Sequence, residues 1–478
     1  MTSARCDHRQ MSKSLEVETM TLILTEPDLE SLRAGLRGPV LGPDDPGYDT
    51  ARRVHNGMID KRPAVIARCT GVADVIAALR FGVEHGLPVA VRGGGHNVAG
   101  KAVCDGGIVI DLSAMKGMQV DPVGRVAHAQ AGLTWGEFDR ETQAFGLATT
   151  GGAVSTTGIA GLTLGGGIGW LQRKYGLACD NLLSADVVTA DGSFVTASAT
   201  ENADLFWGLR GGGGNFGIVT SFEYKLHPVG QVIAGPVVHP FSAARDVLRF
   251  YREYSQGAPD DLFVEAGLAT LPDGQRAVMI FVVYCGPEGE GEELLRPVRE
   301  FGSPLEDMIV PMSYCEVQQA YDGDFPFGLL NYWKSSNLNE LSDPAIDTLV
   351  SFMEAAPSSR PMVIIDQFGG AVARVPNDAT AFGHRDAAYD LIIAAIWSEP
   401  HEQEPHIEWA RQFWEAMQPH TTSDVYVNYL SNEGEGRVRA AYGHHYARLA
   451  ALKRKYDPDN VFQNNQNIKP EAHPQPKG

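Results

Sequence analysis

The sequence predicts an α+β protein in which a glycine-rich domain precedes a domain built on a larger antiparallel sheet. Residues 63–91 have the pattern of a strand, an amphipathic helix and a second strand. Residues 151–169 hold eight glycines in nineteen positions, in a context too apolar for a flexible linker. After about residue 235 glycine clusters become rare, and the apolar alternation over 277–285 and 361–375 is typical of antiparallel strands.

The change near residue 230, from glycine clusters to apolar alternation, divides the chain into domains. Residues 1–40 are polar and then weakly helical, so we expect an N-terminal extension there. Residues 41–230 are expected to form the first domain and residues 231–430 the second. The C-terminal segment 431–470 ends in an Asn- and Gln-rich stretch and is expected to return to the first domain.

The individual elements are predicted from hydrophobic periodicity and from the capping, glycine and turn residues that bound each element. A strand at 63–67 leads to Thr70, the expected N-cap of a helix that ends at Gly86, and a strand follows at 88–91. Two more strands and a hairpin with its turn at 190–193 are expected in the first domain, at 107–112, 125–130 and 184–198. Helices are expected later in the chain, at 242–256, at 387–397 and from residue 436 to a YDPDN turn.

The bulk properties exclude several classes of protein. A formal charge of −20 over 478 residues disfavours nucleic acids and anionic membranes as partners. No apolar run is long enough for a membrane span, and the first twenty residues lack an apolar signal core, so we expect a cytoplasmic protein. The six cysteines show no metal-binding spacing, and we expect reduced thiols and no metal site.

Three glycine clusters indicate a ligand that lies along the main chain. They lie at 93–95, 151–169 and 211–217. The last matches GxGxxG by letter, but it follows a helical segment and precedes a strand, so it is not a Rossmann turn; no P-loop motif occurs. Together the clusters favour a long, flat, phosphate-bearing ligand such as a dinucleotide.

His96 directly follows the first cluster, in VRGGGHN (91–97). Alone, it could be a loop histidine hydrogen-bonded to the backbone or a metal ligand. No second ligand lies nearby at metal-binding spacing. The combination with the other glycine clusters favours a role at the ligand.

Long stretches of the chain resemble the berberine-bridge-enzyme-like FAD-linked oxidases of the vanillyl-alcohol-oxidase superfamily. They include VRGGGHN, residues 158–192 and 204–229, YVNY (426–429) and YDPDNVFQNNQNI (456–468). The resemblance implies a PCMH-type FAD-binding domain of two subdomains and a substrate domain whose antiparallel sheet is covered by helices. It also implies that His96 binds the flavin C8 methyl covalently.

The resemblance implies further cofactor contacts and two departures. Val154 stands where many relatives have a second, cysteinyl link, so a single covalent bond is expected. Gly161 and Leu162 replace the common GGH. The residues implied to contact FAD are Arg92, Gly93, Gly94, Gly95, His96, Asn97, Thr156, Thr157, Gly158, Gly161, Gly166, Gly217, Val219, Asn428, Asn465 and Asn467.

Catalysis requires a hydride acceptor and a base for a substrate proton. The resemblance places the base at Tyr426 or Tyr429. A tyrosine would need its pKa lowered by up to about three units to act at neutral pH, and Lys334 is the expected cation, with Tyr332 and Gln367 as lining residues. If YVNY is a strand, Tyr429 points away from Tyr426 and Asn428. His384 and Arg385 are interpreted as structural.

The expected function is oxidation of a small molecule by flavin. The substrate could be an alcohol, a sugar hydroxyl, an amine or a secondary metabolite, and dioxygen, reduced to hydrogen peroxide, is the expected electron acceptor. The alternatives are a dehydrogenase that uses another acceptor and a flavin-binding protein with vestigial turnover.

Overall fold

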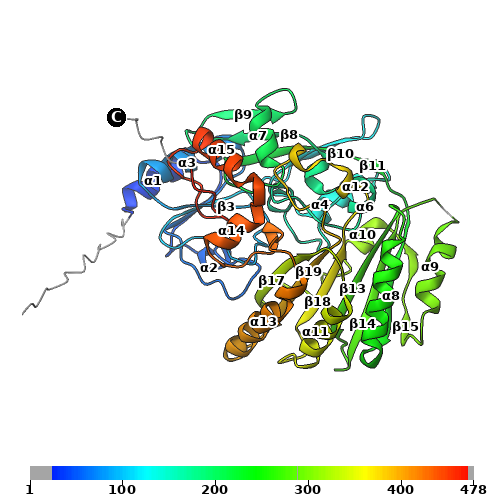
Figure 1. The fold of residues 1–478 in the computed structure, drawn as a ribbon. Helices are drawn as coiled ribbons and strands as arrows, with labels where there is room; N and C mark the ends of the chain where they lie inside the picture. Colours follow the sequence, from blue (N-terminus) through cyan, green and yellow to red (C-terminus); the bar gives the residue numbers. More distant parts are fainter. Residues whose placement is uncertain (1–23, 288, 472–478) are drawn as a thin grey trace, which may run out of the picture.

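The computed structural model describes residues 24–287 and 289–471, and within them the predicted α+β class is confirmed. Two small sheets and their helices form one half of the molecule, and an eight-stranded sheet forms the other (Figure 1). None of the helices in the described part of the chain is long and apolar enough to cross a bilayer.

The first sheet has four strands in the order β1-β2-β4-β3. Strands β2, β4 and β3 are parallel, and the helix α3 connects β2 to β3, which confirms the predicted strand–helix–strand unit. The N-cap of α3 is Gly71 and not Thr70, whose hydroxyl instead donates to Asp74. The bounds are β1 Val40–Leu41, β2 Val65–Arg68, α3 Val72–Glu84, β3 Val89–Arg92 and β4 Ile108–Asp111.

The start of the chain is more structured than expected from residue 24 onward. Helix α1 (Glu26–Gly35) packs against α3 and buries Leu29 and Leu32 in the main core of this half. The weakly helical stretch expected before residue 40 is therefore a helix that packs on the core, because two leucines at i and i+3 give α1 an apolar stripe. Residues 1–23 lie outside the described residues.

The second sheet has five antiparallel strands in the order β5-β6-β10-β8-β9. The predicted hairpin is β8–β9, and its turn contains Gly192 at φ 78°. A helix precedes the last glycine cluster and a strand follows it, as expected. The bounds are β5 Met118–Asp121, β6 Val126–Gln130, β8 Leu182–Val188, β9 Phe194–Ser198, α7 Ala203–Leu209 and β10 Ile218–Lys225.

Short elements complete this half of the molecule. Strands β7 and β11 pair with each other, and short helices lie within and after the second glycine cluster. The bounds are α2 Tyr48–Ala51, α4 Trp135–Gln143, β7 Leu147–Ala148, α5 Ile159–Leu164, α6 Gln172–Tyr175, the 3₁₀ helix η1 Ala178–Asn181 and β11 His227–Pro228.

The large sheet is antiparallel throughout, in the order β15-β12-β14-β13-β18-β19-β17, with β16 also paired to β12. Helices α8, α11 and α13 cover one face (Figure 1). The bounds are β12 Val232–Pro240, α8 Ala244–Gln256, β13 Leu262–Thr270, β14 Arg276–Tyr284, α9 Gly291–Glu300, β15 Glu306–Asp307, β16 Val310–Met312, α10 Tyr314–Val317, β17 Leu330–Leu338, α11 Asp343–Glu354, β18 Met362–Gln367, α12 Ala371–Arg374, β19 Tyr389–Trp397 and α13 Gln403–Met417.

The helix predicted at 387–397 is instead strand β19, which lies between β18 and the edge strand β17. All nine of its residues are buried, because β17 and β18 flank it and both faces of the sheet are covered. A strand buried on both faces has a continuous apolar run, which periodicity cannot distinguish from a buried helix.

The C-terminal segment lies against the first half of the molecule (Figure 1). The single helix expected from residue 436 is two helices, α14 (Glu435–Tyr442) and α15 (Tyr446–Tyr456), which are separated at Gly443 with φ 49°. Beyond α15, the Asn464 side chain donates to the carbonyls of Lys101 and Val103, so this stretch contacts the loop after the first glycine cluster.

Candidate active site

One cavity is lined by all three glycine clusters, by one face of the large sheet and by the C-terminal segment. The wall on the side of the large sheet comes from alternate residues of its strands, whose other face packs on the helices. The glycine-rich loops of the first half lie opposite side chains of the second, so the cavity is enclosed by both.

Two glycines allow the first and second clusters to cross. A Cβ atom on Gly94 would lie 2.4 Å from the backbone nitrogen of Gly158, and a Cβ on Gly158 would lie 2.4 Å from that of Gly94. Gly95 follows at φ 72°, a conformation that other residues rarely adopt. The backbone contact brings His96 next to the residues that precede Gly158.

Both ring nitrogens of His96 have a threonine partner. Nε2 lies 2.8 Å from the Thr156 hydroxyl, and Nδ1 lies 3.3 Å from the Thr157 hydroxyl. The ring stacks on His55, with centroids 3.9 Å apart. Burial, and secondly the neighbouring His55, lower the pKa of His96 to about 3. The imidazole is therefore neutral at physiological pH and keeps a nucleophilic lone pair.

The third cluster wraps the end of α5. The backbone N–H groups of Gly211 and Gly213 both donate to the carbonyl of Leu164, at 3.0 and 2.8 Å. Both glycines have positive φ, 120° and 72°. A Cβ on Gly217 would lie 2.5 Å from the Val187 side chain. The chain here therefore runs closer to its neighbours than any side chain would permit.

Most of the residues that the family resemblance implied for the cofactor line this cavity, and so does Val154. Twelve of the sixteen are among its walls: Gly93, Gly94, Gly95, His96, Asn97, Thr157, Gly158, Gly161, Gly217, Val219, Asn428 and Asn465.

The other four lie just outside these walls. The Thr156 hydroxyl forms a hydrogen bond with His96, and Arg92 donates one to the carbonyl of Ala51. A Cβ atom on Gly166 would contact the Phe382 ring. The Asn467 side-chain oxygen is buried without a hydrogen-bond partner among the described residues.

The YVNY segment is a 3₁₀ turn, η6 (Val427–Tyr429), and not a strand. The expectation that Tyr429 points away from Tyr426 is therefore wrong: both rings line the cavity, in edge contact with centroids 4.8 Å apart. The Tyr426 hydroxyl accepts hydrogen bonds from the Gly167 backbone N–H at 2.9 Å and from the Asn428 amide at 2.7 Å. Burial raises the pKa of both tyrosines.

Lys334 does not supply the expected cation. Its ammonium forms a buried ion pair with Glu433 at 2.5 Å and lies over the Trp414 ring of α13. Tyr332 contacts Arg411 on the same helix, at 3.3 Å. These side chains belong to the helix-covered face of β17, whereas the cavity is lined by Trp333 between them.

The same offset by one residue occurs on β18. The Gln367 side chain donates to the carbonyl of Ser255 on α8, and the residue that faces the cavity is Asp366. This carboxylate was missed at the level of sequence because the wrong face of the strand was assigned to the cavity. Glu265, on the neighbouring strand β13, was missed with it.

Glu265 and Asp366 form a buried acidic pair. They stand directly opposite each other in the β13–β18 ladder, only 2% and 5% exposed. Glu265 also accepts a hydrogen bond from the Tyr321 hydroxyl. Burial, and then the neighbouring Asp366, raise the pKa of Glu265 well above its usual range, and burial raises the pKa of Asp366 to about 6. At neutral pH the pair therefore holds one proton and one negative charge.

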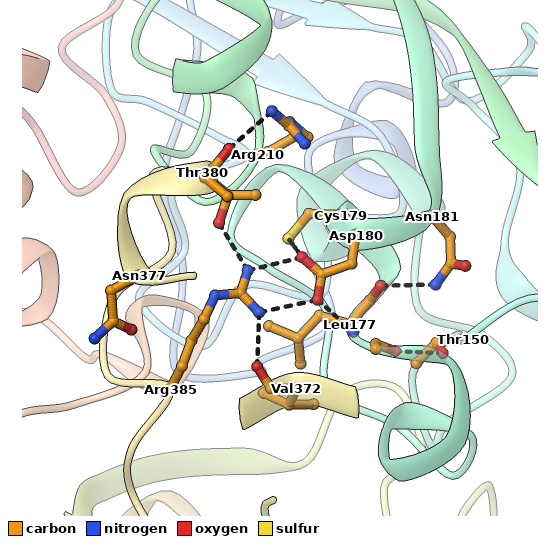
Figure 2. Close-up of polar contacts among 12 residues, drawn as sticks. Thr150, Leu177, Cys179, Asp180, Asn181, Arg210, Val372, Asn377, Thr380 and Arg385 are labelled. Atoms are coloured by element: carbon orange, nitrogen blue, oxygen red, sulfur yellow. Dashed lines mark hydrogen bonds and ion pairs between the residues drawn. The ribbon is translucent and has the colours of Figure 1, made fainter. Parts of the chain in front are cut away.

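Arg385 has a structural role, as expected. Its guanidinium is fully buried and forms a two-pronged ion pair with Asp180, at 2.7 and 3.0 Å, and also donates to the Thr380 hydroxyl (Figure 2). Asp180 belongs to η1, where the Cys179 N–H donates to the Gly166 carbonyl. The ion pair thereby ties the loop between β18 and β19 to the second glycine cluster.

Comparisons with known proteins agree with this geometry. Residues 63–198 match the model of an FAD binding domain, and residues 425–469 match the "berberine and berberine like" model. (R)-6-hydroxynicotine oxidase of Paenarthrobacter nicotinovorans is 32% identical over 91% of this chain and 98% of that protein.

Two solved structures have the same fold over nearly their full length. BBE-like 1 of Physcomitrella patens has a TM-score of 0.85 and 26% identity, covering 93% of this chain and 100% of that one. A chitooligosaccharide oxidase has a TM-score of 0.83 and 26% identity, with the same coverage. The chain has the expected two-subdomain PCMH-type architecture. With its glycine loops, its histidine and its two family matches, it belongs to the berberine-bridge-enzyme-like family of FAD-linked oxidoreductases.

Proposed function

We propose that this enzyme is an oxidase that carries FAD covalently on His96 and oxidises a small organic molecule. The observation that carries the proposal is the position of a neutral imidazole, held by Thr156 and Thr157, at the point where two glycine clusters cross. A protonated histidine could not act as a nucleophile toward the flavin methyl group, and burial, which lowers the pKa of His96, disfavours that state at physiological pH.

The residues present fit FAD. Gly161 and Gly214 line the cavity, and a Cβ at either position would meet no protein atom within 4 Å, so the backbone there is open to a flat ligand. Asn465 and Asn467 each have a buried side-chain oxygen without a hydrogen-bond partner in the described residues, as expected of groups that await a polar ligand. FAD, when bound, supplies the acceptor for a hydride from the substrate.

The acidic pair is the best-placed acceptor for the substrate proton. With a pKa of about 6, the Asp366 carboxyl is largely ionised at neutral pH. Tyr429, by contrast, has a pKa raised by burial and then by the nearby Asp366 and Asp390, so it keeps its own proton. We infer that Asp366 accepts the proton and that Tyr429 orients the substrate, in place of a tyrosine base assisted by Lys334.

Tyr426 has a positioning role in this proposal. Its hydroxyl is already bonded to the Gly167 N–H and to Asn428, and the Asn428 amide also donates to the Leu162 carbonyl. These contacts join the turn of the C-terminal segment to the second glycine cluster. Tyr426 therefore fixes the wall of the cavity and leaves the substrate contact to Tyr429.

A bleaching experiment tests the proposal. The purified yellow protein is mixed anaerobically with a panel of alcohols, sugars and amines, and its flavin absorbance is followed before and after air is admitted. An oxidase bleaches with its substrate and recolours with formation of hydrogen peroxide. Recolouring only with an added quinone or dye would indicate a dehydrogenase, and no bleaching with any compound would indicate vestigial turnover.

A further inference from the structure

We propose that Glu265 and Asp366 form a cation site in the substrate half of the cavity, and that the substrate is an amine which binds as its ammonium ion. The proposal rests on the proposed function, because it assigns a substrate class to the same cavity. It separates amines from the alcohols and sugar hydroxyls that the flavin chemistry would also allow.

Three carboxyl groups lie in a row on the cavity side of the large sheet. The strand registers place Glu265 opposite Asp366, and Asp366 opposite Asp390. Asp390 is fully buried, accepts from Ser335 at 3.3 Å and has one oxygen without a hydrogen-bond partner among the described residues. Asp366 faces the cavity, and Glu265 is its neighbour across the β13–β18 ladder.

No cation of the described part of the protein balances this row. Besides burial, the pKa of Glu265 is shifted by Asp366 and Tyr321, and that of Asp366 by Glu265; none of these groups is a cation. Other titratable groups whose pKa is raised by Asp366 are also acids or tyrosines, namely Tyr251, Tyr429 and Asp390.

Two cations near the large sheet are occupied elsewhere. Lys334 pairs with Glu433 on the other face of the sheet. The Arg173 guanidinium donates to the carbonyls of Leu262, Phe368 and Ala258. A buried carboxylate without a counter-charge is unfavourable, and a cationic ligand would supply the missing charge.

The walls beside the pair are aromatic. Tyr321, which donates to Glu265, lies edge-on to Phe325, with centroids 6.2 Å apart. Phe325 contacts Trp333 at 5.7 Å, and Trp333 contacts Tyr429 at 5.9 Å. Aromatic faces around a carboxylate are the usual surroundings of a bound ammonium group. The net charge of −20 also attracts cations to the protein.

A neutral polyol fits these walls less well. It needs hydrogen-bond partners spread around the ligand, whereas here the carboxylates are gathered at one point. The indole N–H of Trp333 is already directed at the Asn331 side chain, at 3.3 Å. The part of the cavity beside the large sheet therefore offers one focus of negative charge among aromatic side chains.

The site also accounts for the proton that amine oxidation releases. The bound ammonium passes its N–H proton to the Asp366 carboxylate and becomes a neutral amine with a free electron pair. The adjacent C–H bond then breaks, its hydrogen leaves as hydride to FAD, and the nitrogen electron pair forms the C=N bond of an iminium product. The proton leaves Asp366 for solvent when the product departs, so the site returns to its starting charge.

A ligand that cannot be oxidised tests the site without turnover. Benzyltrimethylammonium has neither an N–H proton nor a free electron pair, and its neutral isostere is neopentylbenzene. Binding of each to the FAD-loaded protein is measured by calorimetry and by the flavin absorbance shift. We expect the cation to bind at least about tenfold more tightly than the isostere at pH 8. Its affinity should fall by about tenfold for each pH unit below about 6, as Asp366 takes up a proton.

Isosteric variants locate the effect. Asp366→Asn should lose both the preference for the cation and its pH dependence, whereas Glu265→Gln, which replaces the carboxyl that keeps the proton, should retain the preference. Asp139→Asn is the matched control, because Asp139 is an equally buried carboxyl that lies outside the cavity walls. Flavin content and thermal midpoint are recorded for each variant to show that it folds.

Two results would overturn the inference. One is equal binding of the cation and the isostere, and the other is a cation affinity that does not change between about pH 5 and pH 8. Bleaching by a neutral alcohol or sugar and not by any amine would also contradict it, while leaving the flavin assignment intact. Absence of flavin, with cation binding retained, would instead contradict the proposed oxidase function alone.

Discussion

The crossing of Gly94 and Gly158 allows a direct test of how the histidine is positioned. In Gly94→Ala, the new Cβ atom would lie 2.4 Å from the Gly158 nitrogen and 2.6 Å from its Cα. Both partners are backbone atoms, so no side-chain rotation can relieve the clash. The two chain segments must separate by about 1 Å to reach ordinary contact, which is enough to break the bonds between His96 and its threonines.

Overpacking of this kind costs about 1–3 kcal/mol of unfolding free energy. A domain of roughly 200 residues loses about 2–4 °C of its thermal midpoint per kcal/mol, so we expect a fall of about 2–12 °C. The melt is followed by circular dichroism, and covalently bound flavin is measured as the yellow colour that stays with acid-precipitated protein. We expect that colour to decrease strongly.

Gly35→Ala is the control, because Gly35 is exposed at the end of α1 and a Cβ there meets no atom within 4 Å. It should change neither the midpoint nor the flavin content. If Gly94→Ala melted like the wild type and carried a full complement of covalent flavin, the backbone crossing would not position His96, and the reasoning would be refuted.

Four further variants probe buried polar groups. Burial raises the pKa of Asp139 to about 7, so the folded protein keeps a proton that the unfolded chain loses near pH 4. The free energy of unfolding should therefore fall as the pH rises from about 4 to about 7, by at most about 4 kcal/mol. Denaturant melts of Asp139→Asn should lack this fall. Tyr426→Phe leaves a buried backbone N–H unbonded and should destabilise the protein by about 1–3 kcal/mol, whereas Tyr429→Phe should leave the melt unchanged and slow anaerobic bleaching. Lys334→Met removes one partner of Glu433 and leaves the other, Arg437, so the free energy of unfolding should fall by up to about 3 kcal/mol. The pH midpoint of bleaching should not change. A shifted midpoint would indicate that Lys334 acts in the active site.

The first half of the fold could be predicted well because its signals are local. Glycine clusters, a capped amphipathic helix and a hairpin turn each specify the backbone within a few residues. Strand β19 could not be recognised in the same way, because burial on both faces removes the alternation that identifies a strand.

The substrate side of the cavity was predicted less well because it depends on register. Lys334 and Gln367 are one residue away from Trp333 and Asp366, and a shift of one residue moves a side chain to the opposite face of the sheet. Glu265 lies about one hundred residues before Asp366 in the chain, and only the antiparallel pairing of β13 with β18 brings them together. Cavity residues on a sheet require knowledge of that pairing.

The mass of the intact, denatured protein tests the central claim most directly. We expect the chain to carry the added mass of one FAD less two hydrogens, and peptide mapping to place that mass on the peptide that contains His96. The His96→Ala variant should lack the addition. An unmodified mass for yellow wild-type protein, or an adduct on another residue, would contradict the account.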